Sequence, residues 1–151
     1  MKKDKFKKVL IALDYDVTSK KVAEEGYLLA KSMGAETILL HVISELPVFY
    51  SESNYSHEYK VDLLGDLNLT TQAFLDKAKK HLGDEAVQTV LKEGETADTI
   101  LKTAKEMDVD IIVVGSHSRK WLDNIIGSQA EEVLTNSPIP VLIVPIKKKE
   151  D

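Results

Sequence analysis

The sequence contains no cysteine, which excludes disulfide bonds, thiol catalysis and zinc–thiolate sites. It also lacks an apolar stretch of the roughly 18 residues that a membrane-spanning helix needs. The lysine-rich start resembles a signal peptide, but its apolar run is short and stops at Asp14 and Asp16. These absences lead us to expect a cytoplasmic protein without a membrane partner.

Positive charge is in deficit as well. There are 20 Lys and Arg residues against 25 Asp and Glu residues, for a formal net charge of −5. An acidic chain gains little from attraction to nucleic acid, so we expect no nucleic-acid partner. The lysines near both ends are then interpreted as solvated termini, with a basic nucleic-acid arm as the less favoured alternative.

Several signatures of catalysis and of metal binding are missing. No G-x-x-x-x-G-K-[ST] segment is present, and the turn after the first apolar run has no glycine, which argues against a P-loop and a dinucleotide fingerprint. The histidines His41, His57 and His81 lack the clustered partners of a metal site. His41 is expected in the core or in the wall of a cleft. We predict no catalytic residue and no metal site.

What the sequence does contain is a regular alternation of short apolar runs and helical patterns. Gly34 and Gly83 follow two helical patterns as stop signals, and Thr96 is expected to be an N-cap. The predicted strands are Val9–Leu13, Thr37–Ile43, Val87–Leu91, Ile111–Gly115 and Val141–Val144. The predicted helices are Ser19–Met33, about Val61–Leu82, Thr96–Met107 and Ser128–Thr135.

This alternation predicts one α/β domain over residues 1–151. Continuous apolar strands joined by helices favour a parallel sheet covered on both faces. The expected fold is a flavodoxin-like, doubly wound sandwich with a five-stranded parallel sheet. Ligands bind such sheets beyond the carboxyl ends of the strands, which directs attention to the segments after Leu13, Ile43 and Val114.

The segment Ser44–Lys60 is longer than an ordinary connection and carries three of the five tyrosines. It is interpreted as a surface insertion, as a lid over the cleft or as a partner-binding patch. The sequence leaves these alternatives open.

Two segments carry residues suited to binding an anion or a nucleoside. After the fourth strand, glycine and serine residues and the basic pair Arg119 and Lys120 precede a helix that opens with Gly127–Ser128. Free N–H groups there would favour phosphate, and the alternative is a tight strand exit with a capped helix. After the first strand, Asp14 could bind ribose or base groups or approach a phosphate-bound Mg²⁺. Asp16 or Thr18 is expected to cap the next helix.

The segments "VLIALDYDVTSKKVAEEGYLLAKSMGAETILLHVI", "LKEGETADTILKTAKEMDVDIIVVGSHS" and "GSQAEEVLTNSPIPVLIVP" resemble the universal stress protein family over nearly the whole chain. The resemblance implies a fold like that of the adenine-nucleotide alpha hydrolases. It also implies a homodimer paired through the last strand, Val141–Val144. One branch of the family binds ATP or AMP and another binds no nucleotide.

The nucleotide-binding branch carries glycine, two residues, glycine, nine residues, and then Gly-Ser or Gly-Thr. Here Gly115 and Gly127–Ser128 match, but Ser118 replaces the second glycine and only eight residues separate it from Gly127. Asp14 would face the nucleoside and the Val42 backbone would contact the adenine edge. The residues that the resemblance assigns to the site are Ala12, Leu13, Asp14, Val42, Val114, Gly115, Ser116, Ser118, Gly127, Ser128, Gln129 and Ala130.

The function predicted from this resemblance is regulatory: a cytoplasmic homodimer that binds ATP, ADP or AMP, with Mg²⁺ accompanying the nucleotide, in a stress response. The alternative is a nucleotide-free dimer that acts through protein contacts. A slow ATP hydrolase ranks last, because no residue that would position a water molecule is evident. We therefore expect a binding protein and not an enzyme.

Overall fold

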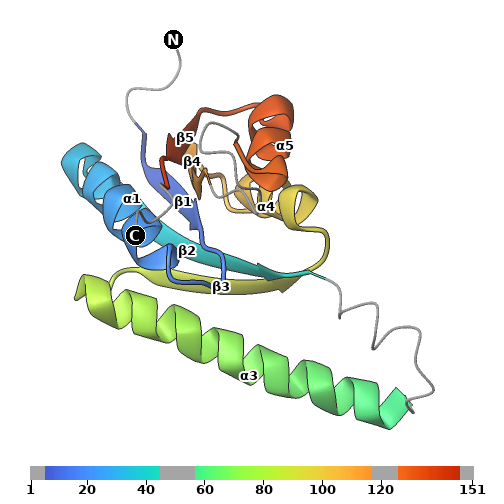
Figure 1. Ribbon diagram of the computed structural model, residues 1–151. Coiled ribbons are helices and arrows are strands. Elements are labelled where there is room, and N and C mark those ends of the chain that lie inside the picture. The colour runs from blue at the N-terminus through green and yellow to red at the C-terminus, as the bar shows by residue number, and fades with distance from the viewer. Residues whose placement is uncertain (1–5, 45–56, 117–125, 147–151) are drawn as a thin grey trace, which may run out of the picture.

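The computed structural model describes residues 6–44, 57–116 and 126–146. Strands and helices alternate along these segments (Figure 1). The elements are β1 (Lys8–Ala12), α1 (Ser19–Met33), β2 (Glu36–Ile43), α3 (His57–Leu82), β3 (Gln88–Glu93), α4 (Thr96–Glu106), β4 (Ile111–Gly115), α5 (Ser128–Asn136) and β5 (Val141–Val144). No described helix is long and apolar enough to cross a membrane.

The five strands form one parallel sheet in the order β3-β2-β1-β4-β5. This confirms the predicted α/β class with a doubly wound sheet. The order differs in one respect from the 2-1-3-4-5 order of flavodoxin. After β2 the chain continues outward to β3 before it returns to the other side of β1, so the order matches the first five strands of a dinucleotide-binding sheet.

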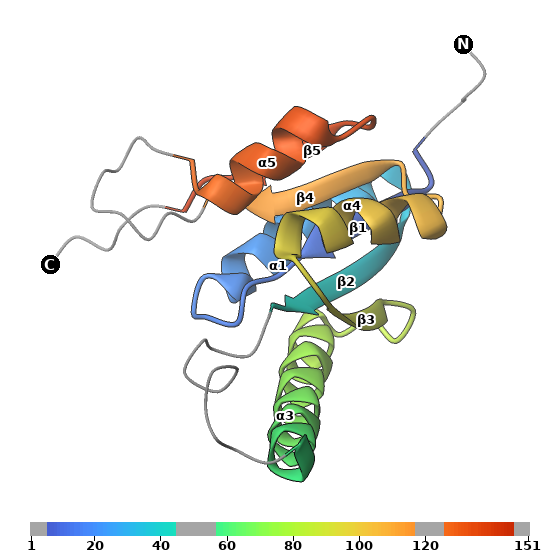
Figure 2. The same cartoon turned by 90° about the vertical axis from the view of Figure 1, so that its right-hand side faces the viewer.

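Helices α1 and α3 cover one face of the sheet, and α4 and α5 cover the other (Figures 1 and 2). Successive residues of a strand point to opposite faces, so both faces need apolar side chains. Val9, Leu10 and Ile11 of β1 are all 0% exposed, with Leu10 in the core under α4 and α5 and its neighbours in the core under α1 and α3. The central strand is therefore buried on both sides, as its unbroken apolar run predicts.

The long helix α3 begins earlier than its sequence pattern indicates. It starts at His57, inside the segment Ser44–Lys60 that we interpreted as an insertion. Residues 57–60 are polar but include good helix formers, and α3 continues through Gly65 without ending. Residues 45–56 lie outside the described residues, so the alternatives for that segment stay predictions.

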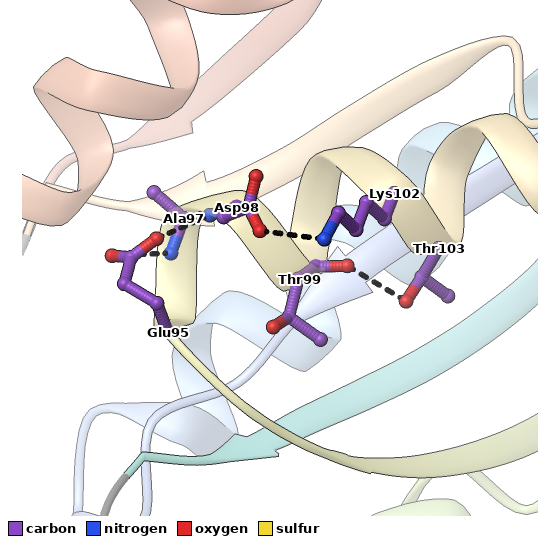
Figure 3. A network of polar contacts seen from close by, with 6 residues as sticks. All are labelled: Glu95, Ala97, Asp98, Thr99, Lys102 and Thr103. Atoms are coloured by element: carbon purple, nitrogen blue, oxygen red, sulfur yellow. Dashed lines mark hydrogen bonds and ion pairs between the residues drawn. The ribbon is translucent and has the colours of Figure 1, made fainter.

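The N-cap of α4 is Glu95, and the expectation that Thr96 caps this helix was wrong. The Glu95 carboxylate accepts hydrogen bonds from Ala97 N at 3.3 Å and from Asp98 N at 2.7 Å (Figure 3). A glutamate side chain is long enough to reach two backbone N–H groups of the first turn. Thr96 becomes the first residue of the helix instead.

Candidate functional site

A large cleft lies at the carboxyl edge of the sheet, where β1 and β4 separate. The strand order reverses at this point, and the helices that follow the two strands cover opposite faces. Such a switch point leaves a crevice that no crossover helix fills. The cleft has a volume of about 1040 Å³, at the upper end of the range of about 300–1000 Å³ of small-molecule sites.

Most residues that the sequence assigns to the site line this cleft. Asp14 lies at the end of β1, Val42 near the end of β2 and Gly115 at the end of β4. The other assigned residues in the lining are Ala12, Leu13, Val114, Gly127, Ser128, Gln129 and Ala130. Segments more than 100 residues apart in the chain thus meet around one cavity.

Ser116 does not line the cleft; it ties β4 to the end of β5. Its Oγ accepts a hydrogen bond from Ile146 N at 2.8 Å, and its N donates to the Val144 carbonyl at 2.9 Å. The Ser116 hydroxyl therefore contributes to the fold by joining the end of β4 to the segment after β5. Ser118 lies outside the described residues, together with Arg119 and Lys120.

Gly115 contributes backbone to the cleft, but its missing side chain serves packing. A Cβ at this position would lie 3.0 Å from Val22 Cγ2 of α1 and 3.4 Å from Ile146 Cγ1. The glycine thus allows α1 to approach β4 closely.

The three helices α1, α4 and α5 begin at this edge, and at one of them, α4, a carboxylate of the chain binds first-turn N–H groups. Glu95 occupies the first turn of α4, as described above. Asp16 Oδ1 accepts a hydrogen bond from Thr18 N at 2.8 Å at the start of α1. Asp16 thus binds the N–H of the N-cap residue Thr18, whose own side chain makes no cap hydrogen bond.

The start of α5 is different, because its N-cap is Gly127, which has no side chain. Gly127 N donates to the Ser116 carbonyl at 3.3 Å, and Glu131 N donates to the Gly127 carbonyl at 3.0 Å. Among the described residues no side chain caps this helix. The first-turn N–H groups of Ser128, Gln129 and Ala130 are therefore the donors available to an anion in the cleft.

An aromatic cluster that the sequence did not reveal closes the α3 side of the cleft. Tyr15 and Phe74 rings lie 4.9 Å apart, and the His41 ring lies 5.8 Å from Phe74. Tyr15 and His41 line the cleft, which confirms His41 as a cleft-wall residue. Tyr15 directly follows Asp14, so its place at a strand end was the signal that could have identified it.

Two ionisable groups with a clearly shifted pKa, Tyr27 and Asp84, lie outside the cleft. The Tyr27 hydroxyl of α1 donates to Asp84 Oδ2 at 2.7 Å. This hydrogen bond raises the pKa of Tyr27 and lowers the pKa of Asp84. Within the described parts of the chain, no group of three or more His, Asp or Glu side chains is arranged to hold a metal ion. The cleft instead offers apolar walls, the carboxylate residues Asp14, Asp16 and Glu131, and backbone donors.

Comparison with known proteins gives a consistent family assignment. Residues 5–145 match the model of the universal stress protein family. The chain is 35% identical to the universal stress protein YxiE of Bacillus subtilis over 146 residues, which cover 92% of this chain and 99% of the relative. It is 32% identical to universal stress protein A homolog 2 of Coxiella burnetii, covering 95% of this chain and 98% of the relative.

Solved structures agree in fold. The hypothetical protein MJ0577 superimposes with a TM-score of 0.77 at 30% identity, covering 95% of this chain and 99% of that one. A universal stress protein in complex with cAMP superimposes with a TM-score of 0.70 at 20% identity, covering 93% and 98% of the two chains. The match over almost the full length shows that this chain belongs to the universal stress protein family.

Proposed function

We propose that the protein is a regulatory dimer that binds an adenine nucleotide in the cleft between β1 and β4. The observation that carries this proposal is the start of α5, which no side chain of the described residues caps and which opens into the same cavity as an apolar pocket and a carboxylate. A nucleotide needs all three, because it combines an apolar base, a hydroxylated sugar and an anion. The cAMP complex of a protein of the same fold is consistent with a nucleotide ligand.

The position of each ligand group follows from the chemistry of the walls. The base would lie between Ala12, Leu13 and the backbone of Val42, which line the buried end of the cleft. Asp14 would accept hydrogen bonds from the nucleoside. The phosphates would bind the first-turn N–H groups of α5, where the helix dipole favours negative charge.

The number of phosphates that the cleft accepts depends on Ser118 and on the loop after Gly115, which is one residue shorter than the family pattern. The proposed ligand is ATP, ADP or AMP, with Mg²⁺ accompanying a di- or triphosphate. We propose binding without turnover, because a hydrolase would also need a positioned water molecule.

Dimerisation through β5 is the second part of the proposal. β5 is an edge strand of the sheet, and among the described residues no strand pairs with its outer side. Leu142 of β5 is 38% exposed and Leu134 of α5 is 47% exposed. Pairing of two β5 strands across a two-fold axis would cover both the strand edge and these apolar side chains.

The first experiment is acid extraction of freshly purified protein, followed by anion-exchange chromatography with nucleotide standards. A near-stoichiometric peak of ATP, ADP or AMP supports the proposal and identifies the ligand. Calorimetric titration of emptied protein then measures the affinity. Ligand at a hundredfold its Kd should raise the free energy of unfolding by about 2.7 kcal/mol.

Asp14→Asn is the variant that tests the cleft. Loss of hydrogen bonds to a charged acceptor should weaken nucleotide binding by about 1.5–3 kcal/mol, or about tenfold to a hundredfold. Asp98→Asn is the matched control, since it removes the same charge from an exposed residue of α4 that pairs with Lys102. Equal affinities in both variants would contradict a site at Asp14.

The alternative function is a nucleotide-free dimer that acts through protein contacts. The replacement of the second motif glycine by Ser118 and the tyrosines of the segment 44–60 favour it. An empty extract and no thermal shift with millimolar nucleotide would support this alternative. Deletion of residues 49–59 should then change the set of proteins that the chain retains from a lysate.

A further inference from the structure

The pairing of β1 with β2 stops one hydrogen bond early, at the floor of the cleft. The last paired residues are Ala12 and Leu40, and Leu13 N still donates to the Leu40 carbonyl at 2.8 Å. In a parallel ladder, a residue that donates to one neighbour accepts from the N–H two positions further along. The next bond would therefore run from Val42 N to the Leu13 carbonyl.

His41 takes that acceptor instead. Its Nδ1 lies 2.7 Å from the Leu13 carbonyl oxygen. A carbonyl oxygen can only accept, so Nδ1 carries the proton and donates. Among the described residues, neither the strand pairing nor any loop hydrogen bond joins Val42 N to Leu13.

The backbone of Val42 is left facing the cleft as a result. Ile43, the next residue, accepts a hydrogen bond from Gly94 N at 3.0 Å and so presents its carbonyl toward β3. Because adjacent residues of a strand alternate, Val42 presents its N–H and carbonyl toward β1, whose ladder has ended. Val42 is 7% exposed and lines the cleft. A backbone N–H at such a position needs a partner, which a ligand or water can provide.

The His41 ring is held in this orientation from two sides. Phe74 of α3 contacts it edge-on, with ring centroids 5.8 Å apart and planes at 75°. Tyr15, in the loop after β1, lies 6.3 Å away and also packs on Phe74. The donor nitrogen is thus fixed on the Leu13 carbonyl by packing as well as by the hydrogen bond.

We propose that His41 is a positioning residue for ligand binding: by occupying the Leu13 carbonyl, it keeps the Val42 N–H and carbonyl open to the edge of a heteroaromatic base. Such an edge carries an acceptor beside a donor, as the ring nitrogen and amino group of adenine do. The ligand in this inference rests on the proposed function. The competition of His41 Nδ1 and Val42 N for the Leu13 carbonyl concerns the protein alone and is tested separately.

The test compares wild-type protein with two variants. His41→Phe keeps a ring against Phe74 and Tyr15 but has no donor. His41→Asn places an amide nitrogen at the same distance along the side chain as Nδ1 and so provides the conservative rescue. In ¹⁵N-labelled protein without ligand, a long-range imidazole correlation spectrum reports which ring nitrogen of His41 carries the proton. Hydrogen exchange reports the protection of the Val42 amide.

We expect a protonated Nδ1 and a Val42 amide that exchanges faster than that of Leu40 in the wild type. In His41→Phe, the Val42 amide should pair with the Leu13 carbonyl and become at least tenfold more protected. Affinity for AMP or ATP should fall about tenfold in this variant and recover in His41→Asn. A purely structural role of His41 would not produce this pattern, because a destabilised variant would lose amide protection and nucleotide affinity together.

Each contrary result has a distinct meaning. A wild-type protein that binds no nucleotide contradicts the proposed function, whereas the exchange data still decide the role of His41. An unprotonated Nδ1, or a Val42 amide protected as well as that of Leu40 in the wild type, overturns the inference without any variant. Unchanged nucleotide affinity in a folded His41→Phe protein overturns it as well.

Discussion

A single substitution, Gly127→Asp, can provide a side-chain cap at the start of α5, where the described part of the chain offers none. Gly127 has φ −58° and ψ 148°, an extended conformation that any residue adopts and that is usual for an N-cap. Glu95 has nearly the same backbone, with φ −71° and ψ 131°, and its carboxylate binds the first turn of α4. A carboxylate at position 127 should bind the first turn of α5 in the same way.

The expected effects on stability and on binding have opposite signs. An aspartate N-cap and its interaction with the helix dipole should raise the free energy of unfolding by about 0.3–1 kcal/mol. The same carboxylate occupies the donors that a phosphate would use and repels it. Two unit charges 4 Å apart interact by about 4 kcal/mol at an effective dielectric constant of about 20. We therefore expect the Kd for nucleotide to rise at least about a hundredfold, or about 2.8 kcal/mol.

Thermal denaturation without ligand and calorimetric titration with ATP or AMP measure the two effects on the same sample. Gly127→Asn is the matched control, since it provides a similar cap without the charge and separates occupied donors from electrostatic repulsion. A Gly127→Asp protein that is stabilised but binds nucleotide like the wild type would refute the placement of phosphate at α5. A destabilised variant would refute the description of this helix start as open.

Three further predictions concern the rest of the fold. Gly26→Ala places a Cβ 2.6 Å from Cδ1 of the buried Ile11. The cost of overpacking, about 1–3 kcal/mol, should outweigh the gain of about 1 kcal/mol in helix propensity. Urea denaturation that shows no loss of stability would contradict this expectation. The hydrogen bond from Tyr27 holds the pKa of Asp84 below its ordinary value. The stability that this hydrogen bond provides should therefore be present above the ordinary carboxyl pKa and lost as pH falls through the lowered pKa. In Tyr27→Phe, the free energy of unfolding should fall less over this acid range, which denaturation across pH measures. Asp110 Oδ2 accepts hydrogen bonds from two backbone N–H groups at the start of β1, at 2.7 and 2.9 Å, so Asp110→Ala should cost about 2–3 kcal/mol in guanidinium denaturation, and a loss below about 1 kcal/mol would show that these groups find other partners.

The sequence predicted the elements well where apolar runs met clear stop signals. The helix Ser19–Met33 and the strands Ile111–Gly115 and Val141–Val144 have the predicted bounds. Gly34 ends the first helix with φ +66°, a conformation that favours glycine. The strand order could not be derived in the same way, because a right-handed crossover can place β3 either next to β2 or on the far side of β1.

The site was predictable at the level of the chain and less so at the level of side chains. Strand ends brought Asp14, Val42 and Gly115 to one edge, as the rule for parallel sheets requires. The hydrogen bond from Ile146 N to the Ser116 hydroxyl could not be predicted, because nothing in the neighbours of Ser116 indicates a contact across 30 residues. The contacts of Phe74 with Tyr15 and His41 depended equally on how α3 packs, which no local pattern reveals.

The two hydrogen bonds of Ser116 join the wall of the cleft to the outer edge of the sheet. Val144 is the last residue of the strand that is proposed to pair with a second copy, and Ile146 follows two positions later; Ser116 is hydrogen-bonded to both. The chain leaving β4 therefore cannot shift without pulling on the end of β5. A small molecule that displaced the chain after β4 would therefore also displace the end of β5 or break these two hydrogen bonds. In this way the two hydrogen bonds of Ser116 couple the cleft to the edge strand of the sheet.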